Sequence, residues 1–154
     1  MSAILHARVV ANVAHNGYIS GETMTILNPV VLACIALLAL LLFGLGFLVS
    51  MTRQRARISM GVTDDHDHAL NRRVRAHANT AEFAPFFALL FLAHGLREPS
   101  VLVLGLIVAA TAARYLIVLG LFTAKTVKRG EPLRFVGALG TYVFGLWLAV
   151  LLVL

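Results

Sequence analysis

The residues with the clearest chemical potential lie in one stretch, residues 72–86, where basic, amide and acidic side chains run directly into a long apolar segment. In a helix, residues three or four apart share a face. Arg75, Asn79 and Glu82 therefore form one polar stripe, and His77 lies on a neighbouring face. Arginine binds carboxylates in bidentate geometry, while a carboxylate can hold an ammonium and an asparagine can pair with amides. The stripe predicts a site for a small zwitterionic ligand, or polar contacts to neighbouring helices.

A membrane-embedded helical bundle is the architecture that must position this stripe. The chain has 154 residues, of which 60% are hydrophobic and 13% are charged, and its mean hydropathy is +0.88. Soluble domains are about half apolar and a quarter charged, so the composition predicts an all-α integral membrane protein with one domain. The 13 Lys and Arg residues outnumber the 7 Asp and Glu residues, but most flank apolar segments. This distribution indicates membrane topology rather than binding to nucleic acid.

Four transmembrane spans are predicted, because a bilayer core requires about 20 apolar residues. The second span must include the polar stripe, since residues 83–96 alone are too short. The predicted spans are residues 25–52, 75–96, 100–124 and 134–154. Residues 1–23 are mixed in character and are expected to be peripheral to function. They either precede a natural start at Met24 or form a short interfacial helix.

The distribution of basic residues predicts the orientation of the bundle. In a four-span chain the two basic connections lie on the same side, and they hold ten of the 13 Lys and Arg residues. The positive-inside rule makes that side cytoplasmic and places both termini outside. Arg53 ends the first span and Arg134 begins the fourth, so both are expected at the depth of the polar stripe.

Arg114 lies inside the third predicted span. Arginine at membrane depth is costly and faces the bundle interior. Two roles remain open for it: pairing with a buried acid, for which Glu82 is the candidate, or contact with a ligand.

No metal site or disulfide is predicted. The run Asp64-Asp65-His66-Asp67-His68 contains competent ligands, but the run is contiguous and lacks a recognised ligand spacing. We interpret it as a solvated loop. The single cysteine, Cys34, lies in an apolar run and gives no disulfide framework.

The order Arg75-Ala76-His77-x-Asn79-x-x-Glu82-x-x-Pro85 resembles the signature of the membrane-associated proteins in eicosanoid and glutathione metabolism, the MAPEG family. The resemblance covers residues 24–154 and includes the four-span layout, the basic loops and the arginine that opens the fourth span. The chain is similar to bacterial-type members of this family that are related to microsomal glutathione transferases. The resemblance implies a homotrimer in the bacterial inner membrane, with glutathione bound between subunits on the cytoplasmic side.

The resemblance also implies roles for individual residues, with glutathione as cosubstrate. Arg134 resembles the catalytic arginine near the glutathione sulfur, where a cation favours the nucleophilic thiolate. A hydrophobic electrophile would arrive laterally from the lipid, for a transferase or a peroxidase reaction. The glutathione-binding residues implied by the resemblance are Arg53, Arg75, His77, Asn79, Glu82 and Arg114.

Three positions depart from the pattern of the eicosanoid-metabolising members. Those members carry a His and a Tyr after the arginine of the third span, and a small hydroxyl residue after the arginine of the fourth. Here Ile117, Leu121 and Phe135 stand at the nearest positions, so eicosanoid specificity is not supported. Tyr115 and Tyr142 are the other hydroxyl aromatics in the spans, and neither is placed in the site.

Two other functions compete with the transferase. A non-catalytic lipid-binding or adaptor member of the same fold would tolerate the missing residues of the third span. A small four-span exporter depends on a membrane-embedded carboxylate in its first span, and residues 25–52 contain no acid. No Ser-His-acid arrangement and no glycine-rich phosphate loop is evident, which argues against a serine hydrolase and a nucleotide-binding protein.

Overall fold

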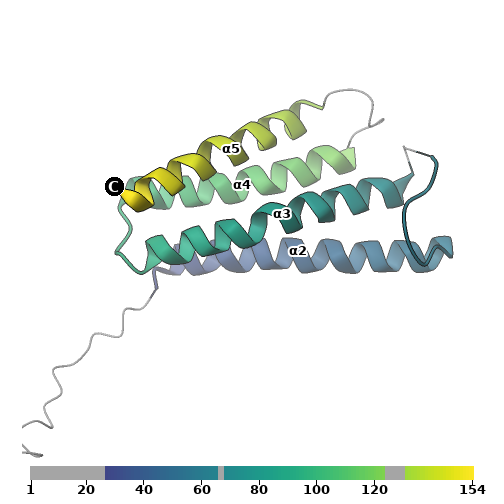
Figure 1. Ribbon diagram of the computed structural model, residues 1–154, viewed down its shortest axis with the longest axis horizontal. Helices are drawn as coiled ribbons and strands as arrows, with labels where there is room; N and C mark the ends of the chain where they lie inside the picture. Colours follow the sequence, from purple (N-terminus) through teal and green to yellow (C-terminus); the bar gives the residue numbers. More distant parts are fainter. Residues whose placement is uncertain (1–26, 66–67, 124–130) are drawn as a thin grey trace, which may run out of the picture.

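The computed structural model describes residues 27–65, 68–123 and 131–154. Within these ranges the chain forms four helices, and Figure 1 shows them side by side, each antiparallel to the next along the chain. The helices are α2 (Pro29–Ala56), α3 (Ala69–Gly95), α4 (Val101–Thr123) and α5 (Pro132–Val153). The prediction of an all-helical protein is confirmed. The expectations for residues 1–23, and for His66 and Asp67 in the acidic run, lie outside the described residues.

Local sequence signals fix the first two helix starts. The side chain of Asn28 accepts a hydrogen bond from the Val30 amide at 2.9 Å, and Pro29 occupies the first turn of α2, where a missing N–H costs little. The Nδ1 atom of His68 accepts from the Leu70 amide at 3.1 Å and caps α3. His68, the last residue of the acidic run, therefore has a structural role in the described chain.

The polar connection between α2 and α3 is shorter than the sequence indicates. Helix α2 continues to Ala56, beyond the predicted span, and α3 begins at Ala69, so the arginines that precede the stripe are helical. Asn71 ties the remaining loop together, because its Nδ2 donates to the Thr63 and Asp65 carbonyls at 2.7 and 2.8 Å. The guanidinium of Arg73 also donates to the Thr52 hydroxyl, which links α3 to α2.

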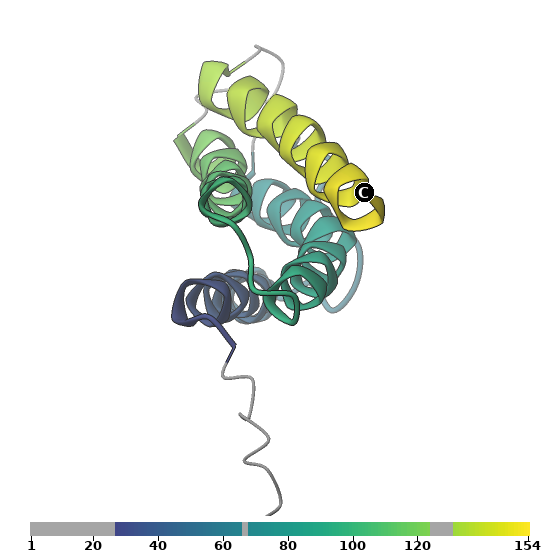
Figure 2. The same ribbon diagram turned by 90° about the vertical axis from the view of Figure 1, so that its left-hand side faces the viewer.

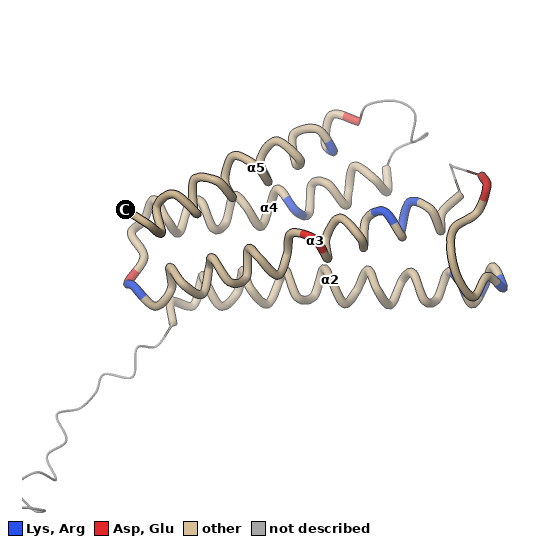
Figure 3. Tube along the Cα trace, in the orientation of Figure 1, with Lys and Arg blue, Asp and Glu red and all other residues tan. Residues whose placement is uncertain are grey.

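Three of the described helices, α2, α4 and α5, are each long and apolar enough to cross a membrane. Helix α3 is not among these apolar helices, because its first half is polar. It nevertheless runs beside the others, and its 27 residues extend over about 40 Å. It continues without interruption through Pro85. Figure 3 shows basic residues gathered at the end of the bundle where α3 and α5 begin.

Helix α4 is the most deeply buried of the three apolar helices. Helices α3 and α4 each pack against all three others, whereas α2 and α5 lie on opposite sides and do not pack against each other in the described chain (Figure 2). Half of the apolar window of α4 is buried, compared with 17% for α5. Helix α5 therefore presents most of its apolar side chains outward, and only Gly137, Thr141 and Leu148 are buried on it.

Two glycines bring the backbones of α4 and α5 into close contact. A Cβ atom at Gly137 would lie 2.7 Å from the carbonyl oxygen of Ala113, and one at Gly120 would lie 2.6 Å from the backbone nitrogen of Arg134. Side chains larger than hydrogen do not fit at either position without movement of the backbone. The contact at Gly120 holds the first turn of α5, and with it Arg134, against the last turn of α4.

Candidate functional site

A polar groove of about 330 Å³ lies at the basic end of the bundle, between α3, α4 and α5. Its size is at the lower end of the range for ligand pockets, about 300–1,000 Å³. Four of the seven sequence-predicted site residues line it, together with small and aliphatic side chains of α3, α4 and α5. Those four are Arg75, Asn79, Glu82 and Arg134. The structure thus brings the stripe on α3 together with the arginine that opens α5.

Among the described residues, the charged groups of this polar groove lack hydrogen-bond and ion-pair partners. Within residues 27–65, 68–123 and 131–154, the side chains of Arg75, Glu82 and Arg134 make no hydrogen bond and no ion pair. Arg75 and Glu82 are exposed, and Arg134 is partly exposed. Two guanidinium groups and a carboxylate therefore line one groove without neutralising one another, an arrangement suited to a ligand that carries both signs of charge.

Arg114 is fully buried directly behind the groove. Its Nη2 donates to the backbone oxygen of Asn79 at 2.9 Å and to the Asn79 Oδ1 at 2.7 Å, and its Nη1 donates to the Thr141 hydroxyl at 3.2 Å. The guanidinium also lies 5.0 Å from the centre of the Phe83 ring, a cation–π contact. Arg114 therefore joins α3, α4 and α5 through neutral partners.

The expected pairing of Arg114 with Glu82 is not what the structure shows. The two groups are near enough for electrostatic interaction, but they form no ion pair in the described chain, and Asn79 takes the position of partner. Both oxygens of Asn79 are occupied by Arg114, so the orientation of its amide is defined. Its Nδ2 donates no hydrogen bond in the described residues and is the polar group that Asn79 can offer to a ligand.

Arg53 and His77 lie apart from the polar groove. The guanidinium of Arg53 donates to the Gly61 carbonyl at 3.3 Å and borders a separate depression on α2. The Arg53 Nε atom is buried and lacks a hydrogen-bond partner among the described residues. His77 faces α2, since a Cβ atom at Gly46 would lie 3.2 Å from its Nε2. A ligand role for these two residues stays a prediction.

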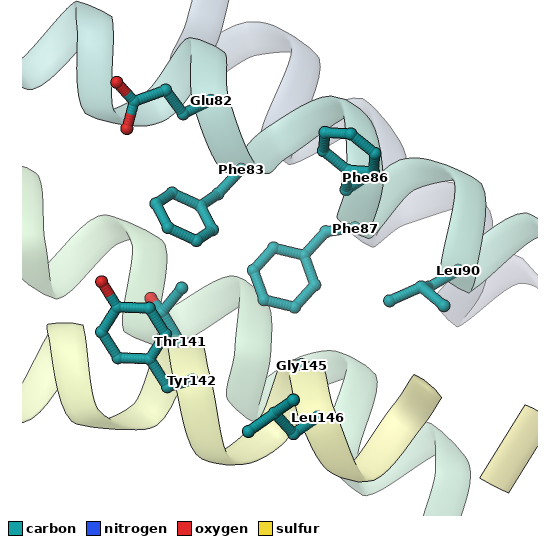
Figure 4. Close-up of a pocket in the computed structure, with 9 residues that line it drawn as sticks. All are labelled: Glu82, Phe83, Phe86, Phe87, Leu90, Thr141, Tyr142, Gly145 and Leu146. Carbon is teal, nitrogen blue, oxygen red and sulfur yellow. The ribbon is translucent and has the colours of Figure 1, made fainter. Parts of the chain in front are cut away.

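A second, apolar pocket of about 330 Å³ lies between α3 and α5, and Glu82 belongs to both spaces (Figure 4). This α3–α5 pocket contains Tyr142 and Thr141, which sequence reasoning did not place in a site. A usable signal existed: the two residues follow Arg134 by seven and eight positions, two helical turns along the same side of α5. Tyr115, by contrast, donates its hydroxyl to the Leu37 carbonyl at 3.0 Å and links α4 to α2.

Comparison with known protein families gives one match. The sequence model of the MAPEG family matches residues 31–154, which include nearly all of the four described helices. The chain belongs to the MAPEG family. The resemblance carried by the Arg75–Pro85 motif is therefore confirmed. Comparisons with curated proteins and with solved structures give no significant match.

Membership in the MAPEG family, together with three helices apolar enough to span, makes the chain a multi-pass integral membrane protein. Glu82 lies about 20 Å along α3 from Gly95, where the apolar half of the helix ends. Its carboxylate is exposed in the described chain.

Proposed function

We propose that this MAPEG protein is a membrane-bound glutathione transferase, which binds glutathione in the polar groove and delivers its thiolate to a hydrophobic electrophile. The observation that carries the proposal is the convergence of Arg75, Asn79, Glu82 and Arg134 on one groove, where the three charged side chains form no ion pair among the described residues. Glutathione carries carboxylates, an ammonium group, peptide amides and a thiol. Each of these groups has a chemical counterpart in the groove.

The assignment of contacts follows from charge and from the Asn79 amide. Arg75 binds a glutathione carboxylate, and Glu82 holds the ammonium group. Asn79 donates its Nδ2 to a carboxylate or peptide carbonyl, because Arg114 occupies its oxygens. The thiol is then assigned to Arg134, the cation at the α5 side of the groove, whose helix start is held by the close contact at Gly120.

The reaction needs a thiolate, and a guanidinium beside the sulfur favours the charged form. The thiol releases its proton to water, and the sulfur lone pair attacks an electrophilic carbon. A carbon–sulfur bond forms, and the leaving group departs with the electron pair of the bond that breaks. Arg134 stabilises the negative charge on sulfur before attack, so its contribution falls on turnover rather than on affinity alone.

The complete site is proposed to form in a homotrimer with α3 as a fourth span. Glu82 and Arg75 are exposed in one chain at a depth where lipid is a poor neighbour, and Arg53 lies on α2, away from the polar groove of its own chain. A second copy that packs its α2 against this groove would cover the charges and add Arg53. We place the groove on the cytoplasmic side of a bacterial inner membrane, because the basic residues gather there.

Isothermal calorimetry with reduced glutathione in detergent tests the proposal, combined with the ultraviolet absorbance of the bound thiolate. We expect saturable binding and a thiolate signal that Arg134→Gln removes while binding persists. Arg55→Gln is the matched control, since Arg55 is an exposed arginine of α2 that does not line the groove. Absence of glutathione binding would overturn the proposal. Binding without thiolate or turnover would favour the non-catalytic member of the same fold.

A further inference from the structure

Pro85 lies inside helix α3, close to the residues that this helix contributes to the polar groove. Proline has no backbone N–H, so it cannot donate the hydrogen bond that an α-helix makes to the carbonyl four residues earlier. The carbonyl affected is that of Ala81, because α3 continues without interruption through Pro85. One backbone acceptor in the middle of α3 therefore lacks its usual helical donor.

No other group in the described chain replaces that donor. Within residues 27–65, 68–123 and 131–154, no side chain and no loop amide donates to the Ala81 carbonyl. Thr80 has the nearest hydroxyl in the sequence, but its side chain is buried and its Oγ1 has no partner among these residues. A backbone carbonyl in a membrane protein is satisfied by a neighbouring helix, a side chain, water or a ligand. The donor for Ala81 must therefore come from outside the described part of the chain.

The freed carbonyl lies on the same side of α3 as the carboxylate of the polar groove. Four residues with the spacing i, i+3, i+4 and i+7 share one side of this helix. They are Ala78, Ala81, Glu82 and Pro85, and all four are exposed. Ala78 and Ala81 carry only a methyl group, so they leave the backbone beside Glu82 accessible. The Ala81 carbonyl and the Glu82 carboxylate are therefore neighbouring acceptors at the edge of the groove.

The other polar groups that line the groove are donors. Arg75 and Arg134 offer only N–H groups. Asn79 offers its Nδ2, because Arg114 occupies its oxygens. An ammonium group has N–H donors that point in three directions, so one carboxylate does not satisfy all of them. A second acceptor beside Glu82 is what an ammonium group in this groove requires.

We propose that the Ala81 carbonyl, freed by Pro85, is a second acceptor for the ammonium group of glutathione, beside the Glu82 carboxylate. The inference rests on the proposed function and adds a specificity determinant to it. Pro85 makes the groove select a ligand with an ammonium group over an otherwise identical ligand without one. An N–H at position 85 would close the carbonyl into the helix and remove part of this selectivity, while the donors for the carboxylates and the thiol stay in place.

Isothermal calorimetry in detergent compares reduced glutathione with deaminoglutathione, which keeps the thiol and both carboxylates but has hydrogen in place of the ammonium group. Each ligand is titrated into the wild type, Pro85→Ala and Pro29→Ala. Pro29→Ala is the matched control, because Pro29 lies in the first turn of α2, where the missing N–H has no helical acceptor. Thermal unfolding without ligand measures the stability of each variant.

We expect the wild type and Pro29→Ala to prefer glutathione over deaminoglutathione by about a hundredfold, and Pro85→Ala by about tenfold, since one charge-assisted hydrogen bond changes a Kd by about that factor. The affinity for deaminoglutathione should be the same in all three proteins. The ligand-free melting temperature of Pro85→Ala should equal or exceed that of the wild type, because the helix regains a hydrogen bond.

An equal loss of affinity for both ligands in Pro85→Ala would assign Pro85 to the shape of α3 and overturn the proposal. A lower ligand-free melting temperature with an unchanged preference would assign the donor to a neighbouring copy and overturn it as well. Equal binding of both ligands by the wild type, with the thiolate signal intact, would refute the ammonium contacts of Glu82 and Ala81 but retain the transferase. A wild type that binds no glutathione would refute both the proposed function and this inference.

Discussion

Arg114 and Glu82 are charged residues at neighbouring depths of the same bundle, but their surroundings are opposite. Arg114 is fully buried and has hydrogen-bond partners on α3 and α5. Glu82 is exposed and has no hydrogen bond or ion pair in the described chain. Both terminal nitrogens of Arg114 are hydrogen-bonded across helices, although its Nε has no partner in the described residues, so the side chain serves the fold, whereas an exposed charge without such partners is available to a ligand or another subunit. The difference separates structural from functional polar residues in this protein.

The largest expected effect is a loss of stability on substitution of Arg114, the structural residue of this pair. Arg114→Ala removes the buried contacts to Asn79 and Thr141 and leaves a cavity, so the free energy of unfolding should fall by about 2–5 kcal/mol. Thermal unfolding in detergent without ligand measures it. Arg114→Lys keeps the charge but loses the paired N–H donors of the guanidinium. Its free energy of unfolding should lie between those of the wild type and Arg114→Ala. A wild-type melting temperature for Arg114→Ala would show that the contacts of Arg114 with Asn79 and Thr141 do not stabilise the bundle.

The glycine contact that positions Arg134 can be tested next. Gly120→Ala places a Cβ 2.6 Å from the Arg134 backbone nitrogen, and overpacking of this kind costs about 1–3 kcal/mol. We expect lower thermal stability together with lower turnover, because the start of α5 must move. Gly105→Ala is the control, since its Cβ has open space. If Gly120→Ala matches that control in both measurements, the close contact is not needed to position Arg134.

Substitution of Arg134 tests the proposed catalytic role of the polar groove without a change in the fold. Its guanidinium has no partner in the described structure, so Arg134→Gln should leave the melting temperature near that of the wild type. Loss of a charge-assisted contact to the thiolate costs about 1.5–3 kcal/mol, roughly a tenfold to hundredfold drop in kcat. Steady-state kinetics with 1-chloro-2,4-dinitrobenzene measures this, with Arg55→Gln as control. Unchanged kcat would exclude Arg134 from the mechanism.

The two tyrosines extend the comparison with a smaller effect. The Tyr115 hydroxyl donates to the Leu37 carbonyl, whereas the Tyr142 hydroxyl makes no hydrogen bond within the described residues. A neutral hydrogen bond contributes about 0.5–1.5 kcal/mol. Tyr115→Phe should therefore lower the free energy of unfolding by about that amount, whereas Tyr142→Phe should leave it near the wild-type value. Thermal unfolding measures both variants. A loss of stability in Tyr142→Phe and none in Tyr115→Phe would contradict this assignment.

Helical periodicity and chain topology were enough to predict most of the polar groove. Arg75, Asn79 and Glu82 share one side of α3 because of their spacing, and Arg134 joins them because it begins α5 at the same end of the bundle. Depth along the membrane does not define the rotation of a helix about its axis. That is why Arg53, expected at the same depth, lies on another side of α2.

The remaining contacts depend on which helix faces meet. Asn79 rather than Glu82 became the partner of Arg114 because of the rotation of α3 against α4, which no spacing within either helix determines. The inclusion of Thr141 and Tyr142 in a pocket depends on how α5 approaches α3, and the glycine contacts between α4 and α5 decide that approach. Such contacts follow from packing of whole surfaces, which periodicity alone does not give.

The central claim is that the unpaired charges of the polar groove exist to bind glutathione, and Glu82→Gln tests it most directly. The substitution keeps size and hydrogen bonding but removes the charge. Thermal unfolding is measured without ligand and with glutathione at about 100 times its wild-type Kd, where binding stabilises the folded state by about 2.7 kcal/mol. We predict that the variant melts like the wild type without ligand and gains little or no stability from glutathione. A variant that keeps the full glutathione-induced stabilisation, or that is already strongly destabilised without ligand, would contradict the account.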